Sequence, residues 1–421
     1  MTIERLYQIF LKCNTISTDT RKIKSGCLFF ALKGDNFNGN KFALEALKKG
    51  AQYVVIDEKE YAKHDHCILV DNVLETLQNL ATFHRKTLNI PIIALTGSNG
   101  KTTTKELINA VLSKTYNTSA TKGNLNNHIG VPLTLLEFTN DTEIGIVEMG
   151  ANHQKEIEFL SNIALPDYGL ITNFGKAHLE GFGSIEGVIK GKSELYNHLR
   201  SHDKVVFVNI NDKTQIEQIG DYEKTIVFGS NMSMLSAQPF IKLKFNNTEV
   251  QTHLTGTYNY NNIAVAIAIG LYFKVDDDSI SEAIANYIPS NNRSQIIEKD
   301  SNKIILDAYN ANPTSMIAAL DNFGAIKGFD KIAILGDMFE LGKTADIEHQ
   351  SISDYSQQLN IDHIYLVGRN FFKTVNKSNK ISRFESFDDL KNELVNSPLK
   401  NKYFLIKGSR GMALERVLDL I

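Results

Sequence analysis

The sequence predicts an α/β protein of three domains, in which mostly parallel sheets are covered by helices. Three observations support this fold class. The chain has 421 residues, more than the roughly 250 to 300 at which one hydrophobic core stops growing. Strand patterns alternate with helical patterns along most of its length, as in parallel sheets. One strand pattern, at residues 92–96, leads directly into a glycine-rich loop and a helix, an arrangement suited to binding phosphate groups.

These patterns divide the chain at two points. Residues 1–88 contain short strand and helix signals separated by turns, which predict a small α/β domain ending in a helix at 73–88. Residues 89–290 start with the glycine loop and predict a central domain with a P-loop-type parallel sheet, its further strands at 144–148, 168–172 and 204–208. Residues 291–421 repeat the alternation and predict a Rossmann-like, doubly wound domain, with strands at 303–307, 331–335, 363–367 and 402–406.

Composition excludes several classes of protein. The net charge of −3, from 45 basic and 48 acidic residues, gives no overall field that attracts nucleic acid. The three cysteines, Cys13, Cys27 and Cys67, are odd in number and unevenly spaced, which favours reduced thiols over a disulfide framework or a zinc site. The sequence shows neither the apolar stretch of a signal peptide nor the ~18 apolar residues of a membrane span. We therefore expect a cytoplasmic protein.

The glycine loop is the strongest functional signal. Its backbone N–H groups and the helix dipole would face phosphate oxygens, Lys101 would neutralise their charge, and the Thr102 hydroxyl could hold Mg²⁺. Leu95 stands where the common P-loop has its first glycine, so GTPase and motor families are disfavoured. An ordinary strand-to-helix turn is the alternative. The predicted ATP-binding residues here are Gly97, Ser98, Asn99, Gly100, Lys101, Thr102 and Thr103.

Other candidates follow the next strands, because ligands of parallel sheets bind beyond the carboxyl ends of the strands. Glu148 ends one strand and could face a metal near Thr102, or could simply be solvated. His178 lies in a glycine-rich loop after the next strand, where it could bind a cation or be an ordinary surface residue. Lys192, in the helix that follows, would by itself be a solvated side chain.

These motifs occur in an order that resembles the Mur ligases of peptidoglycan synthesis. The short phosphate loop, Glu148, the stretch at 177–183 and Lys192-Ser193-Glu194 carry the resemblance. It covers all three predicted domains, with further matches at 19–21, 31–34, 122–127, 256–262 and 407–410. The motifs at 309–313 and 335–342 are the most specific, and they are similar to those of the members that use D-alanyl-D-alanine.

The resemblance implies an ATP-dependent amide ligase. Such an enzyme adds D-alanyl-D-alanine to UDP-N-acetylmuramoyl-tripeptide through an acyl phosphate, and so completes the cytoplasmic pentapeptide precursor of peptidoglycan. Phosphorylation turns a poorly reactive carboxylate into an acylating agent, but it brings two anions together, so the site must concentrate positive charge. We expect a monomer that binds no nucleic acid.

The resemblance also assigns roles to residues. Lys101, His178 and Lys192 are the expected catalytic residues. Two Mg²⁺ ions are implied, one held by Thr102 and Glu148, the other served by His178 and Lys192. A lysine cation cannot bind a metal, and the family's equivalent of Lys192 reacts with CO₂ to give a carbamate, which requires a neutral amine and therefore a lowered pKa.

Three further groups of residues are implied. Asn259 would bind adenine, Asp307 the ribose and Arg293 the phosphates, although Asn259 could instead cap a helix at 262–270. Closure of the C-terminal domain would bring Arg293 and Asp307 into place. Near these residues, Leu306 and the Asn291-Asn292 pair depart from the family pattern. In the predicted UDP-sugar domain, Asn38-Gly39-Asn40 departs from it as well. The UDP-sugar group is Thr18, Asp19, Thr20, Arg21, Lys33 and Gly34, and the dipeptide-side group is Asn310, Asn312 and Asp337.

Two alternatives remain open. A sister Mur ligase or a folylpolyglutamate synthase would share the phosphate loop and Lys192 but would lack the motifs at 310–313 and 335–342. A non-enzymatic ATP-binding scaffold of the cell wall would need no second metal site. The substrate dependence of phosphate release distinguishes these possibilities.

Overall fold

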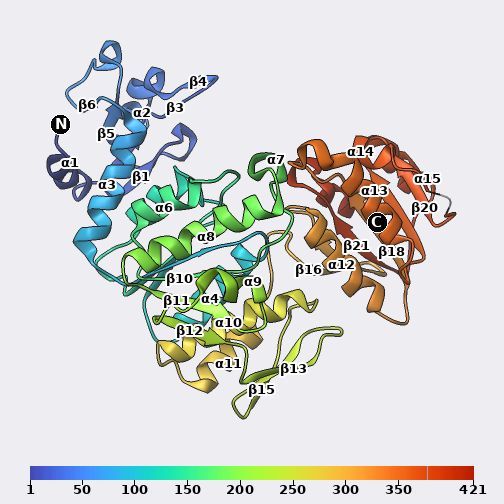
Figure 1. Cartoon of the computed structure of the whole chain (residues 1–421). Coiled ribbons are helices and arrows are strands. Elements are labelled where there is room, and N and C mark those ends of the chain that lie inside the picture. Colours follow the sequence, from blue (N-terminus) through green and yellow to red (C-terminus); the bar gives the residue numbers. More distant parts are fainter. Residues whose placement is uncertain (377) are drawn as a thin grey trace.

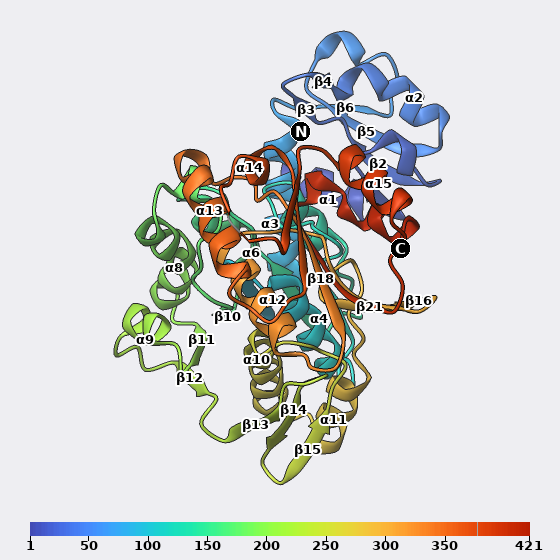
Figure 2. The same ribbon diagram turned by 90° about the vertical axis from the view of Figure 1, so that its right-hand side faces the viewer.

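The computed structural model describes residues 1–376 and 378–421, and it confirms the predicted three-domain α/β fold class. Three large sheets follow one another along the chain (Figure 1). Figure 2 shows the N-terminal sheet at one end of the molecule and a small antiparallel sheet at the other, with the C-terminal sheet in front of the central one. None of the described helices is long and apolar enough to cross a membrane.

The N-terminal sheet has four parallel strands in the order β1-β2-β5-β6. Helix α3 leads from this sheet into the central domain. It begins where the Asn72 side chain accepts a hydrogen bond from Glu75 N–H at 3.0 Å, and it ends at Asn89, whose φ of 48° is left-handed. The elements here are α1 (Ile3–Phe10), β1 (Thr15–Ser17), β2 (Cys27–Phe30), β3 (Lys33–Gly34), β4 (Phe37–Asn38), α2 (Ala43–Lys48), β5 (Ala51–Ile56), β6 (Cys67–Leu69) and α3 (Val73–Leu88).

The central sheet has six parallel strands in the order β12-β11-β10-β7-β9-β8. Its middle strands are buried on both faces, since one apolar cluster packs helices α3, α5, α6 and α8 against one face and another packs α4 and α10 against the other. The strands are β7 (Ile92–Thr96), β8 (Thr118–Ala120), β9 (Ile144–Glu148), β10 (Tyr168–Ile171), β11 (Val205–Asn209) and β12 (Thr225–Phe228). The helices are α4 (Lys101–Leu112), α5 (Gly130–Leu136), α6 (Glu156–Ala164), α7 (Leu179–Phe182), α8 (Ile185–Ser201), α9 (Lys213–Ile219), α10 (Tyr258–Tyr272) and α11 (Asp277–Asn286).

A small antiparallel sheet follows β12, and the sequence patterns did not predict it. Its strands are β13 (Met232–Ser236), β14 (Lys242–Phe245) and β15 (Thr248–Gln251). The buried side chains Leu243, Phe245 and Val250 join the apolar cluster beneath α4 and α10. The sheet therefore extends the central core, and its strands were missed because they are mostly exposed or partly exposed and lack the continuous apolar run of the buried parallel strands.

The C-terminal sheet has six strands in the order β16-β17-β21-β18-β19-β20. Strand β16 is antiparallel to β17, whereas the other pairs are parallel. An antiparallel edge strand on a parallel sheet is common in doubly wound folds. The elements are β16 (Gln295–Lys299), β17 (Asn302–Asp307), α12 (Pro313–Ala325), β18 (Asp330–Gly336), α13 (Ala345–Ser356), β19 (His363–Val367), α14 (Arg369–Phe372), β20 (Ile381–Phe384), α15 (Phe387–Asn396) and β21 (Lys402–Lys407).

Candidate active site between the central and C-terminal domains

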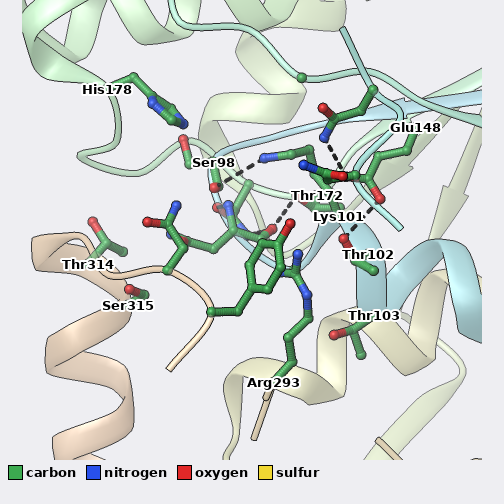
Figure 3. Close-up of a pocket in the computed structure, with 18 of the residues that line it drawn as sticks. Ser98, Lys101, Thr102, Thr103, Glu148, Thr172, His178, Arg293, Thr314 and Ser315 are labelled. Carbon is green, nitrogen blue, oxygen red and sulfur yellow. Dashed lines mark hydrogen bonds between the residues drawn. The ribbon is translucent and has the colours of Figure 1, made fainter. Parts of the chain in front are cut away.

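A cavity of about 890 Å³ lies where the carboxyl ends of the central strands face the C-terminal domain. Both domains supply its lining. In Figure 3, Glu148, Thr102 and Lys101 lie on one side, His178 on the other, and Thr314 and Ser315 on the C-terminal domain's side. The predicted residues that line the cavity are Ser98, Asn99, Gly100, Lys101, Thr102, Thr103, Glu148, His178, Asn259, Arg293, Asp307 and Asn310.

The phosphate loop is held in one conformation by its neighbours. Gly97 has a φ of 144°, and a Cβ there would lie 1.9 Å from Thr172 Oγ1, so no other residue fits. Ser98 Oγ donates to Gly175 O at 2.9 Å, and Asn99 N–H donates to Asn173 Oδ1 at 3.1 Å. The loop that follows β10 therefore fixes the loop that follows β7.

Lys101 opens helix α4, and its Nζ donates to the carbonyl of Gly97 at 2.7 Å. Burial lowers the pKa of this lysine, the Arg293 cation lowers it further, and the Glu148 carboxylate opposes both effects. Arg293 stacks on the Tyr309 ring, with its guanidinium carbon 3.8 Å from the centroid, and its buried Nε has no hydrogen-bond partner among the described residues. Two cations and an unsatisfied donor favour an anion in the cavity.

Glu148 forms the metal-binding candidate with Thr102. The glutamate is 1% exposed, and its two carboxylate oxygens accept hydrogen bonds from Thr102 Oγ1 at 3.0 Å and Asn126 Nδ2 at 2.8 Å. Hydroxyl and carboxylate oxygens fit Mg²⁺, which takes few protein ligands beside phosphate and water oxygens. The described residues hold no cluster of three or more His, Cys, Asp or Glu side chains that could bind a metal.

His178 and Lys192, the expected partners of a second metal, lie in different surroundings. His178, at the start of α7, lines the cavity with its Nδ1 2.5 Å from Glu340 Oε2. Lys192 is fully buried in α8, where its Nζ donates to Ala151 O at 3.1 Å, and it does not line the cavity. Burial, helped by the Lys101 cation, holds the pKa of Lys192 well below its usual range, which favours the neutral form of the amine.

The residues expected at the nucleoside meet the cavity from two domains. Asn259 lies within the first turn of α10, so it does not cap the helix; its Nδ2 donates to Thr255 O at 2.9 Å and its Oδ1 accepts from Asn262 Nδ2 at 2.9 Å. Asp307 ends strand β17 and pairs with Lys407 Nζ at 2.6 Å. Both amide and carboxylate are thus oriented by the protein before a ligand arrives.

Of the three dipeptide-side candidates, only Asn310 lines the cavity. Asn312 caps α12 by accepting from Ser315 N–H, and its Nδ2 donates to Asn99 Oδ1 of the phosphate loop at 2.7 Å. Asp337 is 3% exposed and accepts hydrogen bonds from Asn370 N–H and Phe371 N–H, both at 2.9 Å. Asp337 is therefore occupied at the start of α14, because a strand-end carboxylate satisfies the free N–H groups of that helix.

The UDP-sugar candidates lie away from this cavity, at the carboxyl end of the N-terminal sheet. Thr18, Asp19, Thr20 and Arg21 follow β1, while Lys33 and Gly34 follow its parallel neighbour β2. Hydrogen bonds from Arg21 lower the pKa of Asp19 to about 2. The Lys33 amine lies 3.0 Å from Asp57 Oδ1 and 3.3 Å from Glu58 Oε1. The structure groups these residues at one sheet edge and leaves several of them exposed.

Several lining residues had no role from the sequence alone. Lys407 ends the central strand β21 of the C-terminal sheet, Ser409 and Arg410 follow it, and Glu340 follows β18. Tyr258 reaches the same wall through a 2.9 Å hydrogen bond with Ser294 Oγ. They fall within the stretches at 256–262, 335–342 and 407–410 that carry the family resemblance, but the sequence assigned no individual task to them.

Comparisons with known proteins agree with this geometry. The Mur ligase family, catalytic domain model matches residues 12–93, the Mur ligase middle domain model matches 95–270, and the model of the Mur ligase, glutamate ligase domain matches 292–410. The UDP-N-acetylmuramoyl-tripeptide--D-alanyl-D-alanine ligase of Bacillus subtilis (strain 168) is 34% identical, over 96% of this chain and 93% of that protein.

Solved structures give the same result. The crystal structure of MurF from Acinetobacter baumannii superposes with a TM-score of 0.88 at 30% identity, covering 99% of this chain and 98% of that one. MurF ligase from Thermotoga maritima, solved in complex with ADP, has a TM-score of 0.84 at 26% identity and covers 98% of this chain and 97% of that one. Over nearly its whole length, therefore, the chain belongs to the Mur ligase family.

Proposed function

We propose that this protein is an ATP-dependent ligase that joins D-alanyl-D-alanine to UDP-N-acetylmuramoyl-tripeptide, forming ADP and phosphate. One observation supports this function above all. A single cavity combines the preformed phosphate loop, the buried Thr102–Glu148 pair and two side chains of the C-terminal domain, Arg293 and Asn310. The relatives named above carry the same activity in their names and align with this chain over almost its full length.

The residues of the cavity suit the first half of such a reaction. A carboxylate of the tripeptide attacks the γ-phosphorus of ATP, the bond from that phosphorus to the bridging oxygen breaks, and ADP leaves. Lys101 and Arg293 offset the negative charge that gathers around the transferred group.

In the second half of the reaction, the amine of the dipeptide attacks the acyl carbon, loses a proton, and expels phosphate. Exclusion of water by the closed domains protects the acyl phosphate from hydrolysis.

Magnesium belongs to this proposal. Thr102 and Glu148 would hold one ion against the phosphates, and His178 would serve a second with a carbamylated Lys192. Bound Mg²⁺ would neutralise phosphate charge and orient the transferred group. The neutral, buried amine of Lys192 suits the reaction with CO₂. An intact-mass gain of one CO₂, or a carbamate carbon signal after exposure to ¹³C-bicarbonate, tests this modification; its absence in Lys192→Met and presence in Lys190→Met would assign it to Lys192.

The remaining assignments follow the domains. We propose that residues 1–88 bind the UDP-sugar, 89–290 bind ATP, and 291–421 deliver the dipeptide. Asn259 and Asp307 would contact the nucleoside, and Asn310 the dipeptide, with Asn312 acting through the phosphate loop. Asp337 is not among the proposed dipeptide contacts, because its carboxylate already accepts hydrogen bonds from the backbone at the start of α14. The protein would act in the cytoplasm as a monomer.

Phosphate release by the purified protein with ATP and Mg²⁺ tests the activity. Release that requires both UDP-N-acetylmuramoyl-tripeptide and D-alanyl-D-alanine, with formation of the pentapeptide by mass, supports the proposal. Release that requires a free amino acid or a folate instead would identify a sister ligase or a folylpolyglutamate synthase. Nucleotide binding without any substrate-dependent release would point to a scaffold.

A further inference from the structure

The segment that leads from β10 into α7 contacts the C-terminal domain at two places, on either side of His178. At the first, Lys176 N–H donates to Thr314 Oγ1 of α12 at 2.9 Å, and Lys176 Nζ donates to Glu348 Oε1 of α13 at 2.7 Å. Adjacent Gly175 packs so closely that a Cβ there would lie 3.1 Å from the Thr314 hydroxyl. At this place, a backbone hydrogen bond and an ion pair together join the central and C-terminal domains.

At the second place, the backbones of the two domains meet directly. Glu180 N–H donates to Glu340 O at 3.1 Å, and a Cβ on Gly342 would lie 3.3 Å from the Glu180 Cα. Figure 1 shows the short helix α7, which carries this contact, between the end of α8 and the C-terminal domain. His178, two residues from Lys176 and two from Glu180, is thus held between two points fixed to the other domain.

The ion pair between Lys176 and Glu348 is the part of this contact that a substitution can reverse. The Glu348 side chain is only 11% exposed, whereas that of Lys176 is 53% exposed. A half-exposed pair contributes little to overall stability. Its atoms, however, belong to different domains, so its attraction acts on the equilibrium between joined and separated domains, where a small free energy changes the populations several-fold.

We propose that Lys176 and Glu348 are positioning residues that latch the C-terminal domain onto the central domain and thereby hold His178 at the cavity. The proposal rests on the proposed function in one respect only, that the cavity binds a nucleotide. The pair does not itself line the cavity; it fastens the segment that carries His178, and its release would leave Arg293 and Asp307 farther from the phosphate loop.

Charge reversal with rescue tests the latch. We expect Lys176→Glu and Glu348→Lys each to weaken MgADP binding about three- to tenfold, because reversal replaces an attraction by a repulsion of similar size. Small-angle X-ray scattering of the MgADP-bound variants should give a larger radius of gyration than that of the unchanged protein. The double variant should restore both quantities. In about 1 M salt, where the Debye length is about 3 Å, the single variants should approach the unchanged protein.

A matched pair within one domain serves as the control. Lys402 and Asp330 form a partly exposed ion pair at 2.8 Å inside the C-terminal sheet, so reversing either charge should alter neither ADP affinity nor the radius of gyration. Lys176→Ala and Glu348→Gln should change ADP affinity and the radius of gyration in the same direction as the charge reversals, but by less. They replace any reversal variant whose melting temperature shows misfolding. Single variants that match the unchanged protein in ADP affinity and radius of gyration would overturn the latch. A double variant that binds ADP as weakly as the single variants would also overturn it. Failure to ligate D-alanyl-D-alanine would overturn the proposed function alone, since ADP binding involves no acceptor.

Discussion

The cavity of the central domain and the sheet edge of the N-terminal domain hold their candidate residues by different means. Around the phosphate loop, polar groups are buried or partly buried and several bond to residues distant in the chain, as Glu148 does to Thr102 and Asn126. At the N-terminal edge, exposed Arg21 pairs with Asp19 only two residues away, and the amine of Lys33, whose side chain is 44% exposed, pairs with Asp57 and Glu58. The first arrangement is fixed before a ligand binds, whereas the second can rearrange around one.

This difference predicts where substitutions act. A preorganised, buried charge stabilises a transition state without reorganising, so its loss should reduce kcat. An exposed side chain that turns toward a ligand contributes mainly to binding, so its loss should raise KM. The four predictions below run from the largest expected effect to the smallest.

Lys101→Ala should reduce the kcat of ligation by about a thousandfold or more, because the cavity loses the cation that faces the transferred phosphoryl group. Phosphate release in the presence of all substrates measures the effect. Lys114→Ala, just beyond the end of α4, should leave the rate unchanged. A Lys101→Ala variant as fast as the unchanged protein would remove the basis of the proposed reaction.

Glu148→Gln should lower kcat about a hundredfold at moderate Mg²⁺, with partial recovery as Mg²⁺ is raised, because the amide still accepts hydrogen bonds but binds the ion weakly. Rates measured over a Mg²⁺ titration check this. Glu143→Gln, immediately before the same strand, is the matched control. A Glu148→Gln enzyme with an unaltered Mg²⁺ dependence would assign the metal elsewhere.

Lys33→Ala should raise the KM for the UDP-sugar substrate about five- to tenfold while kcat changes less than twofold, consistent with the loss of one charge-assisted contact. Initial rates at varied UDP-sugar concentration separate the two constants. Exposed Lys41→Ala should change neither. If kcat fell instead, the N-terminal edge would be as preorganised as the central cavity, and the comparison would fail.

His84 links the N-terminal and central domains, since its Nδ1 lies 3.1 Å from the Tyr7 hydroxyl and its Nε2 lies 2.9 Å from Phe138 O. Burial lowers the pKa of His84 below its ordinary value of 6.5. The unfolded chain therefore binds more protons as the pH falls below 6.5, so stability decreases toward acid and is fully retained above 6.5.

His84→Phe should cost about 1 to 3 kcal/mol at pH 7.5 through its lost hydrogen bonds, yet it should lose less further stability at pH 5.5 than the unchanged protein. Melting temperatures at the two pH values provide the measurement. Exposed His153→Phe is the control and should leave the pH sensitivity intact. An unchanged pH sensitivity in His84→Phe would show that other groups govern acid stability.

Some features of the fold could be predicted from local sequence. The helix at 73–88 and the strands at 144–148 and 363–367 have the predicted bounds, because caps, turns and apolar runs act over a few residues. The antiparallel sheet of β13 to β15 was missed, since its short strands depend on packing beneath α4 and α10. The edge strand β16 was missed for a similar reason, as its direction is set by pairing with β17.

The sequence by itself determined the phosphate loop of the site. Only glycine fits at Gly97, and the loop, lysine and threonine are adjacent in the chain, so their chemistry could be recognised without a fold. Tertiary structure decided the rest. In the folded protein, Asp337 binds the N–H groups at the start of α14, and Lys192 is buried outside the cavity lining. Asn312 contacts Asn99, 213 residues away in the sequence, and Lys176 contacts Glu348, 172 residues away. Burial and contacts between distant residues depend on the packing of whole domains, which short-range patterns do not encode.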